Sequence, residues 1–222
     1  ADAVLASKPI AFWRLHGGLA SQAKNAVTLS SLGTNAPAAS AAVYEDGSKP
    51  LEANSTVPNF SGGRVNVKVP ELGDTYSIEL WVRNELPVES RPVTAYVFSR
   101  AVDGVDGAMG DNLGIGGTHS DMGRLIVFNG NQRDQLVAGK TPIVQGSWSH
   151  VVMVREDQRI TVYLNGDVEP EIAEDLPIGY PDGCGQILLG GRADNFANLQ
   201  GMMEEIALYD RALNPAEVAA HF

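Results

Sequence analysis

The sequence of 222 residues has a single cysteine, Cys184, so it cannot form an intrachain disulfide. This thiol lies between two glycines, and no base partner is identifiable for it, which favours an inert side chain over a nucleophile. A chain of this length can bury a full core without cross-links. The missing disulfides therefore leave the cellular compartment open.

Histidine is also scarce and dispersed. The four histidines, His16, His119, His150 and His221, include no pair spaced four residues apart, which argues against a zinc site. We expect His150 to be a structural histidine held by hydrogen bonds. The sequence has no G-x-S-x-G nucleophile elbow and no phosphate-binding loop.

Long apolar runs are absent as well. No run approaches the roughly 18 apolar residues that indicate a membrane-spanning helix, and no basic leader precedes an apolar stretch. The sequence therefore predicts no membrane span. A start at Ala1-Asp2 is compatible with a signal peptide that has already been removed.

Basic residues are outnumbered, with 16 Lys and Arg against 27 Asp and Glu and a net charge of −11. Residues 151–222 carry 13 acids against 4 bases, so most of the excess lies in the last third. A surface of this sign repels phosphate backbones, which excludes nucleic acid as the expected partner. Cations and neutral polymers stay compatible with it.

What the sequence does contain is period-two alternation, which predicts strands. In Thr75–Arg83, Tyr76, Ile78, Leu80 and Val82 fall on one face. Further strands are predicted at Val93–Arg100, Asn112–Gly116, Gly123–Asn129, Trp148–Arg155, Arg159–Asn165, Gln186–Gly190 and Met202–Tyr209. Their spacing, broken by Gly, Asp and Asn, indicates an antiparallel sandwich or barrel.

The connections between strands carry their own signals. Asn165-Gly166 tolerates positive φ and closes a tight turn. Asn214–His221 has an N-cap Asn, a Pro at the first position and Glu217 at the third, which predicts a short C-terminal helix. Val27–Ser55 is weakly periodic and is interpreted as a surface excursion. Without a long Gly/Ser/Pro linker, residues 1–222 are predicted to form one domain.

Five segments occur in an order that resembles one family. They are Pro9–Leu15 (P-x-A-x-W-R-L), Tyr76–Val82 (an E-x-W-V strand), Trp148–Val152 (W-x-H-V), Ile160–Gly166 (Y-x-N-G) and Gly201–Leu213 (an acidic pair followed by Y-x-R-A-L). Together they resemble the laminin G-like modules of the concanavalin A-like lectin and glucanase superfamily, in particular the bacterial branch.

The resemblance implies an all-β fold, a two-sheet antiparallel jelly-roll sandwich with one concave face and a short C-terminal helix. It also implies that Phe12–Leu15 lies near Met202–Tyr209. The glucanases of the superfamily use an E-x-D-x-(x)-E strand, and this sequence has only the single Glu79 in the corresponding type of segment.

The adjacent acids Glu204 and Glu205 bear directly on function. Neighbouring residues of a strand point to opposite faces, so the pair is not expected to act on one bond. Many superfamily members hold calcium with an acid of the last strand and carbonyls of a Gly-containing turn, and calcium prefers oxygen ligands. The resemblance thus implies a structural calcium ion at Glu204 and Gly63, with a surface carboxylate as the alternative for Glu204.

Candidate ligand residues come from the predicted connections that would surround the concave sheet. Sugar recognition uses exposed aromatic rings and polar side chains. The residues that meet this description are Asp111, Asn112, His119, Arg192, Asp194, Asn195 and Phe196. The acidic segment Asp103–Asn112 is interpreted as a turn-rich connection, with a metal rim as the alternative.

These observations predict a non-catalytic module that binds a glycan or a protein surface, is secreted or displayed at the cell surface, and is compatible with a larger multidomain protein. Two alternatives remain. A glycan-active enzyme of the same fold would need several carboxylates clustered on the concave face. A structural or adhesive domain would show a large exposed apolar patch and a defined oligomer.

Overall fold

The computed structural model describes residues 2–15, 22–23, 42–44, 48–50, 58–69, 72–102, 104, 107–131, 136–180 and 185–222. The predictions for Cys184, for His16 and for Asp103 lie outside these residues. Most of the predicted excursion Val27–Ser55 lies outside them too. Two of its short segments are strands, so it is not wholly irregular.

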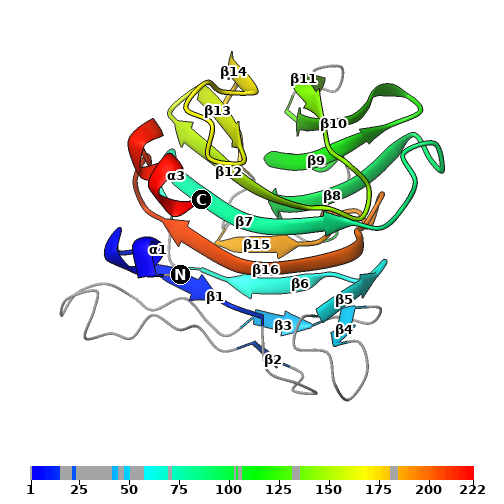
Figure 1. The fold of residues 1–222 in the computed structure, drawn as a ribbon, viewed down its shortest axis with the longest axis horizontal. Coiled ribbons are helices and arrows are strands. Elements are labelled where there is room, and N and C mark those ends of the chain that lie inside the picture. The colour runs from blue at the N-terminus through cyan, green and yellow to red at the C-terminus, as the bar shows by residue number, and fades with distance from the viewer. Residues whose placement is uncertain are drawn as a thin grey trace.

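The chain forms two antiparallel sheets that pack face to face (Figure 1). Sheet A has the order β14 (Ile172–Asp175), β13 (Arg159–Leu164), β12 (Trp148–Glu156), β7 (Thr75–Asn84), β16 (Gln200–Tyr209), β5 (Pro58–Ser61) and β4 (Ser48–Pro50), and β1 (Ala11–Trp13) also pairs with β16. Sheet B has the order β11 (Leu136–Pro142), β10 (Ser120–Asn129), β9 (Asp111–Gly117), β8 (Val93–Arg100), β15 (Gln186–Leu189), β6 (Val65–Lys68), β3 (Ala42–Tyr44) and β2 (Gln22–Ala23).

The inner faces of the two sheets supply the main hydrophobic core. Sheet A contributes the predicted face of β7, with Ile78 and Leu80 fully buried. Sheet B contributes alternate residues of its long strands, such as Leu125 and Val127 of β10. Trp13 is also fully buried in this core. The structure is a jelly-roll sandwich, as the resemblance implied, and it agrees with the antiparallel sandwich or barrel that the alternation predicted.

The strand predictions are confirmed, with boundaries within three residues of those observed. The predicted neighbourhood of the first and last strands is confirmed too, because Ala11–Trp13 pairs with Ile206–Leu208. Helix α3 (Pro215–His221) begins at N-cap Asn214, whose side chain and that of Glu217 complete a reciprocal capping box. No helix in the described part of the chain is long and apolar enough to cross a membrane.

The outer face of sheet A is covered by the two terminal helices, α1 (Asp2–Ala6) and α3 (Figure 1). Glu79 projects from β7 into this layer and lies 2.6 Å from His221 Nδ1 of α3. The other ring nitrogen of His221 lies 2.8 Å from Ser7 Oγ, just beyond α1. The single acid of the E-x-W-V segment therefore fastens both terminal helices to the sheet.

Candidate functional site

The segment Gly190–Leu199 joins β15 to β16 and lies on the outer face of sheet B. The Tyr96 amide of β8 donates to the Ala197 carbonyl at 2.8 Å, and Tyr96 forms a parallel bridge with Asn198. The buried Asn198 amide donates to Gly62 O at 2.8 Å and to Asn195 Oδ1 at 3.0 Å. These bonds fix the loop against β8 and against the turn between β5 and β6.

Arg192 lies at the centre of this loop, among three aromatic rings. Its guanidinium carbon is 4.8 Å from the Tyr96 ring centroid, 5.2 Å from that of Phe128 and 4.7 Å from that of Phe196. Asp194 accepts two hydrogen bonds from the same guanidinium, at 2.9 and 2.7 Å. We call these five residues the Arg192 cluster.

The Arg192 cluster stands on an apolar surface. Period-two alternation turns Ile126 and Phe128 of β10 outward, because Leu125 and Val127 face the core. Val93, Tyr96 and Ile126 are buried beneath this surface, and the half-buried residues around them are Phe128, Leu136, Ala138 and Ala197. Phe196 is the most exposed of the three aromatic rings in the Arg192 cluster, with 43% of its surface exposed.

The charges within the cluster stabilise each other. Burial acts to raise the pKa of Asp194, but the hydrogen bonds and charge of Arg192 outweigh it, so this pKa lies below its ordinary value. Burial acts to lower the pKa of Arg192, and Asp194 with Tyr96 shifts it upward instead. Arg192 and Asp194 therefore stay charged at neutral pH. The arrangement offers an apolar ring face beside a carboxylate acceptor.

Four of the seven predicted ligand residues meet in this loop: Arg192, Asp194, Asn195 and Phe196. Asn195 and Phe196 are exposed, and Asn195 takes a left-handed backbone conformation with a φ of 59°. His119 is exposed in the hairpin turn between β9 and β10. Asp111 is the first residue of β9, and His119 follows its last residue. At the rise per residue of a strand, the two are roughly 20 Å apart.

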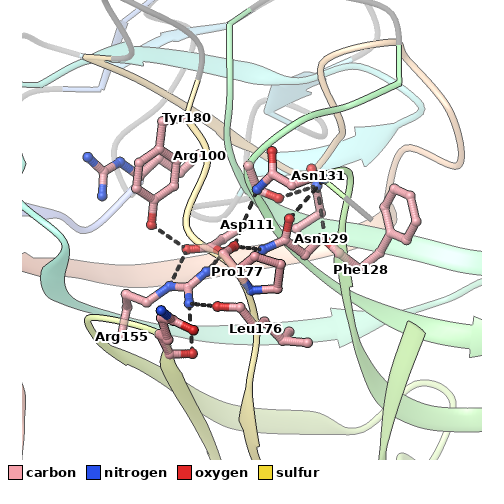
Figure 2. Close-up of polar contacts among 12 residues, drawn as sticks. Arg100, Asp111, Phe128, Asn129, Asn131, Arg155, Leu176, Pro177 and Tyr180 are labelled. Carbon is pink, nitrogen blue, oxygen red and sulfur yellow. Dashed lines mark hydrogen bonds and ion pairs between the residues drawn. The ribbon is translucent and has the colours of Figure 1, made fainter. Parts of the chain in front are cut away.

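Asp111 occupies a buried network at the other end of β9 (Figure 2). It is fully inaccessible, and its carboxylate pairs with Arg155 of β12, which is equally buried. The hydroxyls of Tyr76 and Tyr180 donate to Oδ2 of Asp111 at 2.8 and 2.7 Å. The guanidinium carbon of Arg100 lies over the Tyr180 ring, 3.8 Å from its centroid. This carboxylate is committed to joining the two sheets and is closed to solvent.

The electrostatics of the network follow from its burial. Burial, followed by the charge of Asp111, raises the pKa values of Tyr76 and Tyr180. Burial opposes the charge on Arg155, but the hydrogen bond and charge of Asp111 raise its pKa above the ordinary value. Arg155 also donates to Leu176 O at 2.9 Å. Arg155 therefore stays charged and the two tyrosines stay neutral over the physiological range.

Asn112, the next predicted ligand residue, is also fully buried. Its amide donates to the carbonyls of Ala108, Gly110 and Phe128, between 2.9 and 3.1 Å. Its side-chain oxygen accepts from Ser99. Asn112 thus holds the connection before β9 in place. It reaches the Arg192 cluster only through the backbone carbonyl of Phe128.

The predicted calcium ligands, Glu204 and Gly63, do not lie together. Ser61 pairs with Gln200, and the Gly62 amide donates to Leu199 O, so this turn lies beside the start of β16. Glu204 lies four residues beyond Gln200, roughly 14 Å along the strand. The described residues contain no cluster of three His, Cys, Asp or Glu side chains able to hold a metal. The separation along β16 argues against Glu204 and Gly63 sharing one ion, and a bound calcium stays a prediction.

The acid pair on β16 is interrupted by a β-bulge. Glu204 pairs with Trp81 and Ala207 with Glu79, so β16 has an extra residue at this point. Glu205 takes a φ of 51° there and forms an ion pair with Arg14 at 3.7 Å. The prediction that Glu204 and Glu205 point to opposite faces assumed a regular strand, and the strand is not regular at these two residues.

The prediction for His150 requires a correction. The residue is 1% exposed, yet neither ring nitrogen has a hydrogen-bond partner among the described residues. Instead the imidazole packs against Trp81 in a tilted arrangement, with ring centroids 5.2 Å apart, and its centroid lies 6.1 Å from that of Phe222. Burial, with help from the charge of His221 and against that of Glu79, lowers its pKa to about 4.

Sequence reasoning missed two aromatic members of the cluster, Tyr96 and Phe128. Both lie on predicted strands, and they were not distinguished from core residues. In Gly123–Asn129 the residues at alternate positions, 126 and 128, are apolar on the face opposite the core. A strand that is apolar on both faces indicates that its outer face is covered or binds a ligand, and that signal could have identified Phe128.

A family profile described as the concanavalin A-like lectin and glucanases superfamily, of the laminin G-like type, matches residues 59–219. The chain belongs to this family. The match begins at β5 and ends in α3, so it includes the Arg192 cluster of this laminin G-like chain and most strands of both sheets.

Solved structures of similar fold come from proteins with different activities. Domain 4 of AbnA, an extracellular arabinanase from Geobacillus stearothermophilus in complex with arabinotriose, is 18% identical, with a TM-score of 0.52 over 81% of this chain and 80% of that one. A Trypanosoma rangeli sialidase in complex with sialic acid is 14% identical, with a TM-score of 0.62 over 94% of this chain and 31% of that one. A pentraxin from Limulus polyphemus is 19% identical, with a TM-score of 0.50 over 68% and 70%. Likeness at these identities shows the fold.

Proposed function

We propose that this laminin G-like chain is a non-catalytic glycan-binding module whose site is the Arg192 cluster. The observation that carries the proposal is the Phe196 ring, which is exposed on a loop fixed by backbone hydrogen bonds and contacts the Arg192 guanidinium, as the half-buried Phe128 ring also does. Exposed aromatic rings stack on the apolar faces of sugars, and adjacent polar groups bind the hydroxyls. Asp194 and Asn195 supply those polar groups.

The rigidity of the loop supports this assignment. Arg91 donates to the carbonyls of Thr94 and Asn198, and Arg64 donates to those of Arg192 at 2.8 Å and Ala193 at 3.3 Å. A loop held in this way loses little conformational entropy when a ligand binds. The similar domain of the arabinanase was solved with an arabinose oligosaccharide, which is consistent with sugar recognition by such domains.

An enzyme of the same fold is the main alternative. The similarity to a sialidase supports this alternative. An enzyme that cleaves a glycosidic bond would require two acids that converge on that bond. Asp111 is buried in an ion pair with Arg155, and Glu205 forms an ion pair with Arg14. Neither carboxylate is therefore available as a catalytic acid at the Arg192 cluster. A polysaccharide ligand would be met outside the cell, so the proposal includes secretion or surface display.

We predict that Phe196→Ala weakens glycan binding about tenfold or more, which corresponds to roughly 1.4 kcal/mol. The substitution removes the exposed stacking face and leaves the buried part of the cluster in place. A glycan array, with and without chelator, would first identify a ligand, and isothermal titration calorimetry would then compare the variants.

The matched control is Phe222→Ala, because Phe222 is also exposed, at 61%, but stacks on Trp81 over sheet A. We expect this variant to bind as the wild type does. Equal losses in both variants, or no loss in Phe196→Ala, would refute the assignment of the site. Hydrolysis of the bound oligosaccharide by the purified wild type would favour the enzyme instead.

A further inference from the structure

We infer that the glycan bound at the Arg192 cluster is uncharged, and that Asp194 enforces this by occupying the arginine that an acidic sugar would use. The inference rests on the proposed function and concerns the chemical class of ligand at the same site. A carboxylate or sulfate group on a sugar is best recognised by the paired N–H groups of a guanidinium. The accessibility of that guanidinium therefore decides which class of glycan can bind.

The guanidinium of Arg192 is already engaged. Its Nε and Nη2 donate to the two oxygens of Asp194, so the fork that matches a carboxylate is filled from within the chain. Nη1 donates to the Tyr96 hydroxyl at 3.1 Å. The ring contacts leave the Arg192 side chain only 12% exposed.

Two other arginines near the loop are turned to internal partners in the same way. Arg64 is 3% exposed and donates to the carbonyls of Arg192 and Ala193. Arg91 donates to Thr94 O and Asn198 O. On the same face of β10, Arg124 forms an ion pair with Asp121 at 3.6 Å. Each of these cations has a partner within the chain.

The part of the cluster that solvent reaches is apolar or acidic. The Asp194 side chain is 30% exposed and Phe196 is 43% exposed. An acidic sugar would bring its negative charge beside the Asp194 carboxylate, in a protein that already carries a net charge of −11. A neutral sugar can instead donate its hydroxyls to Asp194 while its apolar face rests on Phe196.

The test compares four soluble probes by calorimetry at low salt. Arabinotriose and maltotriose are the neutral probes, and trigalacturonate and sialyllactose are the acidic ones. We expect the wild type to bind at least one neutral probe and to bind the acidic probes at least tenfold more weakly. Asp194→Asn keeps the shape of the side chain but frees the charge of Arg192, and we expect it to gain at least tenfold in affinity for an acidic probe.

The double variant Asp194→Asn with Arg192→Gln is the control, and it should lose this gain. Circular dichroism and the unfolding midpoint would establish that each variant is folded. Tight binding of an acidic probe by the wild type that is lost in Arg192→Gln would overturn the inference and leave the glycan-binding proposal intact. A folded Asp194→Asn variant without the gain would also overturn it. If the wild type binds none of the four probes and no glycan on the array, the proposed function and the inference are both overturned.

Discussion

Asp111→Ala is expected to lower the free energy of unfolding by about 3–5 kcal/mol, because it leaves the Arg155 guanidinium buried without its counter-charge. Both side chains are fully inaccessible, and the carboxylate accepts from Arg155, Tyr76 and Tyr180 at once. Domains are stable by only about 5–15 kcal/mol. The variant should therefore lose a large part of its stability. Urea denaturation at pH 7, followed by circular dichroism, would measure it.

Asp175→Ala is the matched control. Asp175 pairs with Arg159 at 3.2 Å, but the two side chains are 72% and 45% exposed. An ion pair in water contributes about 0–1 kcal/mol. A second comparison replaces both buried partners, in Asp111→Leu with Arg155→Met, and should be less destabilising than Asp111→Ala alone. If Asp111→Ala and Asp175→Ala lose similar stability, the structural role assigned to the buried network is wrong.

Acid should weaken the fold through His150, by about 2 kcal/mol at pH 5 and about 3 kcal/mol at pH 4. The folded-state pKa of about 4 lies below the ordinary value of 6.5, so the unfolded chain binds the proton more tightly. This contribution to stability is complete above pH 6.5 and is lost as the pH falls toward 4. The physical cause is an imidazole buried beside the Trp81 and Phe222 rings without a hydrogen-bond partner among the described residues.

His150→Phe isolates this contribution, because phenylalanine keeps the stacking on Trp81 and cannot bind a proton. Free energies of unfolding would be measured from pH 4 to pH 7 for both proteins. The difference between them should grow in favour of the variant as the pH falls. The exposed His119, changed to Phe, is the control for replacing a histidine away from the Trp81 ring. Parallel curves for wild type and His150→Phe would contradict the assigned cause.

Most of the long strands were predictable because apolar residues recur at every second position on the face toward the main core, as in β7 and β12, but the seven-residue β11 was missed. The short strands β5, β6 and β14 were missed, since segments of four residues carry too little periodicity to separate from loops. The bulge at Glu205 was not predictable either. Its existence depends on the pairing of β16 with β7, which local sequence does not specify.

The candidate site was predictable in part for a related reason. Arg192, Asp194, Asn195 and Phe196 lie within five consecutive residues, so their proximity is local. Asp111 instead pairs with Arg155, which lies 44 residues away in the sequence. The sequence alone suggested an exposed ligand residue at this position, because it does not show that Arg155 buries the carboxylate. Tyr96 and Phe128 join the cluster only through the packing of the loop on sheet B.

The most direct test of a glycan site at the Arg192 cluster is an amide chemical-shift titration with a neutral oligosaccharide identified by the array. We expect the largest shifts in Arg192–Asn198 and at Tyr96 and Phe128, and we expect the Phe196→Ala protein to lose them. Shifts concentrated instead in the β9–β10 turn around His119, or on the outer face of sheet A around Trp81, would contradict it.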